Sequence, residues 1–168
     1  MAIIHPFPPV YDANSRILIL GTFPSVKSRE GEFYYHHPQN RFWRVISGLL
    51  REDLPITIEE KRQLLLRNRI ALWDVIRSCE ITGSSDSSIR NVVTNDIDSL
   101  LKQVRIREVY ANGGTAFRLY QRYILPVTGK NIISLPSTSP ANAACSLEQL
   151  MSRWRVIRTE LEQPEEVL

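Results

Sequence analysis

Four short apolar runs along the chain predict buried β-strands. Each is four to seven residues long and consists mainly of Ile, Leu, Val and Ala, and most end at a turn residue. Between these runs, apolar residues recur at the three- and four-residue spacing of amphipathic helices. The predicted strands are Ile17–Leu20, Ile70–Ile76, Glu108–Ala111 and Asn131–Leu135. The predicted helices follow Asn40, begin near Thr57, span Ile89–Val104 and Thr115–Leu125, and run from Ser146 to about Leu161.

Two of the predicted helices carry capping boxes at their starts. Thr57 is followed three residues later by Glu60, and Ser146 by Gln149, so each pair can satisfy backbone N–H groups of a first turn. Short strands alternating with helices are typical of a parallel sheet covered on both faces. We therefore predict an α/β fold with three layers, α/β/α, around a central, mostly parallel sheet of four strands.

Polar loops follow all four predicted strands. In open α/β sheets, ligands bind at the carboxyl ends of the strands, so these loops are expected to meet at one edge of the sheet. The loops are residues 21–25, 74–86, 112–114 and 136–142. Their convergence is the main indication, from the pattern alone, of where a site lies.

The segment from Arg16 to Trp43 is the richest of these regions. After its strand and Gly21, about twenty polar and aromatic residues precede the next helix, and a loop of this length inside a compact domain is typically functional. Before it, residues 1–14 contain Pro6, Pro8 and Pro9 and are expected to form an extended surface segment.

Length and composition indicate a single globular domain. The 168 residues are 43% hydrophobic and 23% charged, which is ordinary for one domain spanning residues 1–168 with a tail at 163–168. No apolar run is long enough for a membrane span, and the first residues do not form a secretory signal. Two distant cysteines fit a reducing compartment, so a cytoplasmic protein is expected. The net charge of +3 favours a polyanionic partner only weakly.

Several classes of enzyme lack their motifs in this chain. There is no GxxxxGK[ST] phosphate loop, no GxGxxG fingerprint and no GxSxG elbow. Three histidines, two of them adjacent, make a metal site unexpected, and we predict no metal and no cofactor. The loops instead offer glycines, side-chain amides and aromatic rings. This combination suits a nucleobase, because amides bind base edges and aromatic rings stack on bases.

Four sequence blocks together resemble the uracil-DNA glycosylase superfamily. They are GTFPSVKSREGEFYYHHPQNRFW, ALWDVIRSCEITGSSDSSIRN, ANGGTA and LPSTSPANAA, in the expected order over about residues 14–160. The resemblance is strongest to the hypoxanthine-DNA (deoxyinosine) glycosylase branch, and HPQNRFW is also similar to the mismatch-specific uracil/thymine glycosylases. It implies a metal-free, monofunctional and monomeric enzyme that flips a deaminated base out of single- or double-stranded DNA and hydrolyses its N-glycosidic bond. Such an enzyme would act at the nucleoid, without an obligate protein partner.

The resemblance also assigns roles to residues. The asparagine or aspartate that relatives carry in the first motif is replaced by Phe23, and the catalytic amide is expected at Asn40, where it would hold the attacking water. The base is expected to contact Gly21, Thr22, Phe23, Pro24, Phe33, Tyr34 and Asn112, with Phe33 or Tyr34 stacked on its ring. The DNA is expected to contact Ser25, His37, Ser137, Thr138, Ser139, Pro140, Ala141 and Asn142.

Structural roles compete with several of these assignments. Asn40 is also a favourable helix cap, Asn112 with two following glycines is also a turn, and the aromatic residues could belong to the core. Asp74 or Asp86 could act on the water, although a structural hydrogen bond is favoured for Asp74. Two other functions stay open: a non-catalytic damage-binding module of the same fold, and a hydrolase of free nucleosides or nucleotides.

Overall fold

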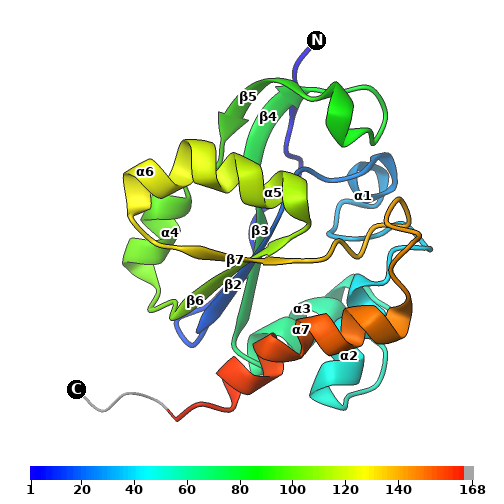
Figure 1. Ribbon diagram of the computed structural model, residues 1–168, viewed down its shortest axis with the longest axis vertical. Helices are drawn as coiled ribbons and strands as arrows, with labels where there is room; N and C mark the ends of the chain where they lie inside the picture. Colours follow the sequence, from blue (N-terminus) through cyan, green and yellow to red (C-terminus); the bar gives the residue numbers. More distant parts are fainter. Residues whose placement is uncertain (165–168) are drawn as a thin grey trace.

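The computed structural model describes residues 1–164 and has a parallel four-stranded sheet at its centre (Figure 1). The order of strands is β3-β2-β6-β7, and all three neighbouring pairs are parallel. These strands are β2 (Ile17–Gly21), β3 (Ile70–Asp74), β6 (Glu108–Asn112) and β7 (Ile132–Leu135). The four predicted strands, the parallel sheet and the α/β class are therefore confirmed.

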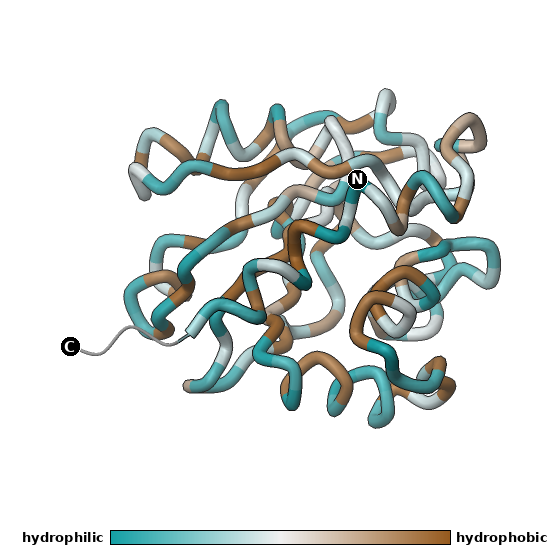
Figure 2. Tube along the Cα trace, turned by 60° about the horizontal axis from the view of Figure 1, so that its bottom comes forward, coloured by the Kyte–Doolittle hydropathy of each residue, from teal (hydrophilic) through white to brown (hydrophobic). Residues whose placement is uncertain are grey.

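Helices cover both faces of this sheet. On one face lie α2 (Phe42–Leu50), α3 (Ile58–Arg67) and α7 (Leu147–Leu161), and on the other lie α4 (Ile97–Gln103), α5 (Gly114–Leu119) and α6 (Leu125–Thr128) (Figure 1). Alternate residues of β2 serve the two faces: Ile17 and Ile19 pack with the first group of helices, and Leu18 and Leu20 with the second. Figure 2 shows the hydrophobic residues concentrated on the central strands and the inward sides of the helices.

Both predicted capping boxes are present. Thr57 accepts a hydrogen bond from the Glu60 N–H and Ser146 accepts one from the Gln149 N–H, while each partner side chain binds the backbone of its cap residue. The predicted helix from Thr115 is interrupted, because a π-helical turn (Tyr120–Ile124) lies between α5 and α6. The long loop after β2 holds a short helix, α1 (Val26–Gly31), capped by the Ser25 side chain.

The predicted helix over Ile89–Val104 is wrong in its first half. A 3₁₀ turn (Asp86–Ser88) precedes β5 (Arg90–Thr94), which pairs antiparallel with β4 (Ile76–Glu80), and α4 begins only at Ile97. The helix starts there because the Asp96 side chain accepts a hydrogen bond from the Ser99 N–H. The run Val92–Thr94 is β-branched, and pairing with β4 decides its conformation.

The expected surface segment at residues 1–14 is also different in the structure. Its β1 (Ile3–Ile4) pairs with β4, Val10 forms a bridge with Leu72, and Phe7 and Val10 are buried. The N-terminal segment is therefore part of the packed domain and lies against the strand that leads to Asp74. Within residues 1–164, no helix is long and apolar enough to cross a bilayer.

Candidate active site

A cavity of about 350 Å³ lies at the carboxyl ends of the four parallel strands. All four strand-end loops contribute to its wall, as their spacing predicted. The lining residues are Gly21–Ser25, Ser28, Tyr34, Tyr35, Asn40, Asp74, Ser84–Ser87, Asn112, Ser137–Ser139 and Ala141. Most of the predicted site residues therefore surround one cavity, with neutral amides and hydroxyls, two carboxyl groups and several aromatic rings.

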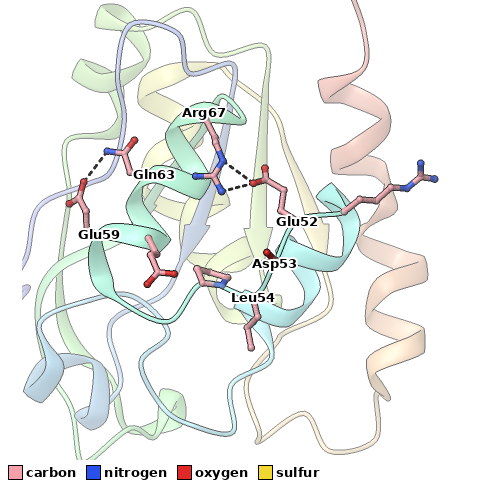
Figure 3. Close-up of a pocket in the computed structure, with 9 residues that line it drawn as sticks. Glu52, Asp53, Leu54, Glu59, Gln63 and Arg67 are labelled. Carbon is pink, nitrogen blue, oxygen red and sulfur yellow. Dashed lines mark hydrogen bonds and ion pairs between the residues drawn. The ribbon is translucent and has the colours of Figure 1, made fainter.

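A second and larger hollow lies elsewhere, beside α3 and the segment between α2 and α3 (Figure 3). Several of its polar side chains bind one another: Arg67 donates through Nε to Glu52 at 2.8 Å, and Gln63 donates to Glu59 at 2.9 Å. None of its residues belongs to a strand-end loop. The strand-end cavity is therefore the better candidate for an active site.

Gly21 opens the floor of the cavity at the end of β2. A Cβ atom at this position would lie 2.4 Å from Asp74 Oδ1 and 2.7 Å from the Tyr35 hydroxyl. Cβ atoms in proteins essentially never lie within 3.0 Å of a non-bonded atom, so only glycine lets both side chains approach the end of the strand. The first residue of the GTFPS motif thus creates space for two side chains that come from other segments.

Asn40 belongs to a chain of hydrogen bonds that joins three of these loops. Its Oδ1 accepts one hydrogen bond from the Phe42 N–H at 2.9 Å and another from the Thr138 hydroxyl at 2.8 Å. Thr138 Oγ1 accepts in turn from Asn112 Nδ2 at 3.0 Å. The Phe42 N–H fixes the orientation of the Asn40 amide, because only the oxygen can accept from it. Both lone pairs of Oδ1 are used, and the Nδ2 donor is the group left for a ligand.

Asn112 is held more tightly than a base-contacting residue requires. Besides donating to Thr138 Oγ1, it accepts from the Thr138 N–H through Oδ1 at 3.0 Å, and its side chain is largely buried. This pair of bonds fixes the loop after β7 to the end of β6. One lone pair of the amide oxygen remains for the base contact that the sequence predicts, while the second N–H is placed toward the Tyr35 hydroxyl.

Replacing Thr138 by Val tests this network. Val has the same shape but leaves the amides of Asn40 and Asn112 each short of one partner, so the free energy of unfolding is expected to fall by about 1–3 kcal/mol. Base excision should slow as well, because Asn40 then keeps only its hydrogen bond from the Phe42 N–H and is held less firmly. Thermal unfolding and single-turnover excision measure the two effects. The matched control, Thr138→Ser, keeps the hydroxyl and should retain most of both; equal losses in the two variants would contradict this role.

Two predicted stacking residues lie in the core instead. Phe33 is 2% exposed, does not line the cavity, and stacks on Trp43 with ring centroids 6.0 Å apart. Tyr34 is 1% exposed and its hydroxyl donates to the Pro8 carbonyl at 3.0 Å. It lines the cavity, but its ring is almost entirely covered by protein. The stacking role predicted for Phe33 is therefore wrong, and Tyr34 is poorly placed for it. Phe23, a partly exposed lining residue, is the better platform for a base.

Tyr35, Asp74 and His5 form a part of the site that the motifs did not assign. Asp74 Oδ2 accepts a hydrogen bond from His5 Nε2 at 2.8 Å, and both side chains are buried. The Tyr35 ring stacks on Phe42 with centroids 4.2 Å apart, and its hydroxyl lies beside Asp74. Burial raises the pKa of Tyr35 above its ordinary value and Asp74 raises it further, so the hydroxyl keeps its proton; the Asn112 amide opposes this shift.

The loop after β7 is attached to the segment before α2 by Arg41. The guanidinium donates to the carbonyls of Ser139 at 3.3 Å and Asn142 at 3.1 Å, and also to that of Cys145. The Arg41 N–H binds the Thr138 carbonyl at 3.1 Å. The loop Ser137–Asn142, which is predicted to contact DNA, is therefore held in its conformation by one residue of the HPQNRFW block.

Comparison with known proteins places the chain in a family. The family model described as "Uracil DNA glycosylase superfamily" matches residues 8–158. The chain belongs to this superfamily. The match covers every loop that lines the cavity, and the chain is a DNA glycosylase of this superfamily.

Relatives within the superfamily are similar over nearly their whole length. The chain is 37% identical over 153 residues to the hypoxanthine DNA glycosylase of Methanosarcina acetivorans, covering 90% of this chain and 95% of the relative. It is 37% identical over 151 residues to the protein of the same name from Methanosarcina barkeri, covering 88% and 93%. The chain is also similar to a Methanosarcina acetivorans protein that has a solution NMR structure and is named as a proposed uracil DNA glycosylase. The two structures superimpose with a TM-score of 0.82 at 36% identity, over 97% of this chain and all of that chain. Among the described residues of the glycosylase, no group of three or more His, Cys, Asp or Glu side chains could hold a metal ion.

Proposed function

We propose that this glycosylase removes hypoxanthine, and also uracil, from DNA by hydrolysing the N-glycosidic bond, as a step of base excision repair. The observation that carries the proposal is the Asn40 amide, fixed at the wall of a cavity of a size suited to one base, with its Nδ2 donor directed by the bonds that Oδ1 accepts. Two relatives named hypoxanthine DNA glycosylase support the choice of base.

Once the base is in the cavity, the main task of the protein is to stabilise the charge that develops as the bond breaks. Cleavage of the bond leaves negative charge on the base and oxocarbenium character on the sugar. A fixed donor in a dry cavity stabilises such developing charge strongly, because it needs no reorganisation. We assign this contact to Asn40 Nδ2, in place of the water-holding role expected from sequence, since Oδ1 already accepts two hydrogen bonds.

The remaining assignments follow from position. Phe23 supplies a ring for stacking on the flipped base, and the Thr22–Pro24 turn forms the edge of the cavity. Ser25, His37 and the loop Ser137–Asn142 are proposed to contact the DNA backbone around the flipped nucleotide. None of the described lining residues is lysine, so we propose a product with an abasic site and no further strand cleavage.

Single-turnover incubation with defined duplexes tests the proposal. Duplexes carrying inosine, uracil, xanthine or a G·T mismatch are incubated with excess enzyme, and abasic sites are revealed by alkali. We expect cleavage with inosine and with uracil and none with an undamaged duplex. Tight binding without cleavage would favour a damage-binding module, and release of base from free deoxyinosine alone would favour a nucleoside hydrolase.

A further inference from the structure

Asp74 presents a free carboxylate oxygen to the cavity. Its Oδ2 is bound to His5, whereas Oδ1 has no hydrogen-bond partner among the described residues and lies at the floor beside Gly21. The Asp74 side chain is otherwise buried, so a ligand that fills the cavity must supply a donor to Oδ1 in place of water. The His5 contact fixes which oxygen faces the cavity.

Tyr35 presents a hydroxyl to the same place. This oxygen is buried, and its proton meets no acceptor within residues 1–164; the Asn112 amide is placed to donate to the oxygen. The backbone of Tyr35 has a φ of 52°, a left-handed conformation that is unfavourable for an aromatic residue. A buried hydroxyl whose proton has no acceptor and a strained backbone at one residue are typical of a group whose partner arrives with a ligand.

The two groups form an acceptor and a donor at one end of the cavity. Carboxylate oxygen only accepts, and the Tyr35 hydroxyl, which keeps its proton, is free to donate. A lactam offers the complementary pair, a ring N–H next to a carbonyl oxygen. Adenine and cytosine offer the reverse pattern, a ring nitrogen lone pair next to an amino group.

We propose that Asp74 and Tyr35 are the specificity-determining residues of this glycosylase, with Asp74 Oδ1 accepting the ring N–H of the flipped base and the Tyr35 hydroxyl donating to the neighbouring carbonyl. The inference rests on the proposed function and adds to it the basis of selection. Hypoxanthine and uracil satisfy both groups. Adenine or cytosine would direct a lone pair at a carboxylate and leave the hydroxyl unpaired, and a site built this way rejects the wrong partner strongly.

Tyr35→Phe gives the first test, because it removes one hydroxyl whose proton has no acceptor in the free protein. We expect single-turnover excision of hypoxanthine to slow at least about tenfold, while the melting temperature stays the same or rises. The matched control is Tyr120→Phe, whose buried hydroxyl donates to the Lys130 carbonyl at 2.6 Å far from the cavity. There the melting temperature should fall and excision should not change. Normal excision by Tyr35→Phe would overturn the role of its hydroxyl.

Asp74→Asn gives the second test, because an amide can donate where the carboxylate only accepts. Excision of hypoxanthine is compared with excision of unsubstituted purine, which has a lone pair at N1 and no carbonyl. We expect the ratio of the two rates to fall by about 100-fold or more in Asp74→Asn. Taking the ratio in both proteins cancels the different leaving abilities of the two bases. A ratio equal to that of the wild type would overturn the inference.

Excision by the wild-type protein distinguishes failure of the proposed function from failure of the assignment of Asp74 and Tyr35. If it releases hypoxanthine or uracil and both variants behave like it, the proposed function stands and the assignment of Asp74 and Tyr35 fails. If the wild type releases neither base, the proposed function fails and the assignment fails with it. A loss of selectivity without a loss of folded protein supports both.

Discussion

Asn40→Ala should lower the single-turnover rate of base excision by about 10²–10³-fold, the effect of removing one fixed donor at a site of developing charge. The same change also removes the oxygen that accepts from Phe42 N–H and Thr138, so a loss of about 1 kcal/mol in the free energy of unfolding accompanies it. Excision is measured on an inosine duplex, and stability by thermal unfolding.

Asn40→Asp separates these two effects. It keeps an oxygen for both hydrogen bonds, replaces the Nδ2 donor by an oxygen that cannot donate, and adds a negative charge, so we expect a folded protein that is nearly as inactive as Asn40→Ala. Asn68→Ala serves as the control for stability, because Asn68 also binds backbone at a helix end, through the Leu64 carbonyl at 2.8 Å, but lies away from the cavity. Full activity in Asn40→Asp would show that donation from Nδ2 is not needed.

Gly21→Ala is expected to damage both stability and activity. The new Cβ would stand 2.4 Å from Asp74 Oδ1 and 2.7 Å from the Tyr35 hydroxyl, so both side chains must move into the cavity. We expect the free energy of unfolding to fall by about 1–3 kcal/mol, typical of overpacking, and excision to be nearly abolished.

The glycine that opens α5 provides the control for this change. A Cβ on Gly114 would meet only the end of the flexible Arg118 side chain, at 3.1 Å. Gly114→Ala should therefore leave both stability and excision near wild type. If Gly21→Ala behaved in the same way, the close packing at the floor of the cavity would not matter for the reaction.

The sequence predicts the central layer of this fold well because the signals there are local. Runs such as Ile17–Leu20 have no polar interruption, and their burial on both faces leaves no other conformation open to them. The capping pairs at Thr57 and Ser146 are equally local. By contrast, the conformation of residues 90–94 depends on pairing with β4, a strand that, apart from Ile76, was predicted as a polar loop.

The candidate site was predicted in part for the same reason. Strand-end loops meet because parallel strands point the same way, so the cavity and the place of Asn40 follow from order along the chain. Which ring of Phe33, Tyr34 and Tyr35 enters the cavity depends on the positive φ of Tyr35, and nothing in the residue types shows that. The approach of His5 to Asp74, 69 positions apart, is likewise a result of tertiary packing.

The Arg41 contacts have a consequence for how this protein searches DNA. A loop that folds only on binding loses conformational entropy at each encounter, including encounters with undamaged sites. Here the backbone of residues 139–145 is already held by one guanidinium before DNA binds. Each trial contact therefore costs little, and the free energy of binding is available for turning out the base. A loop that is ordered before binding therefore favours many short encounters with DNA over a few long ones.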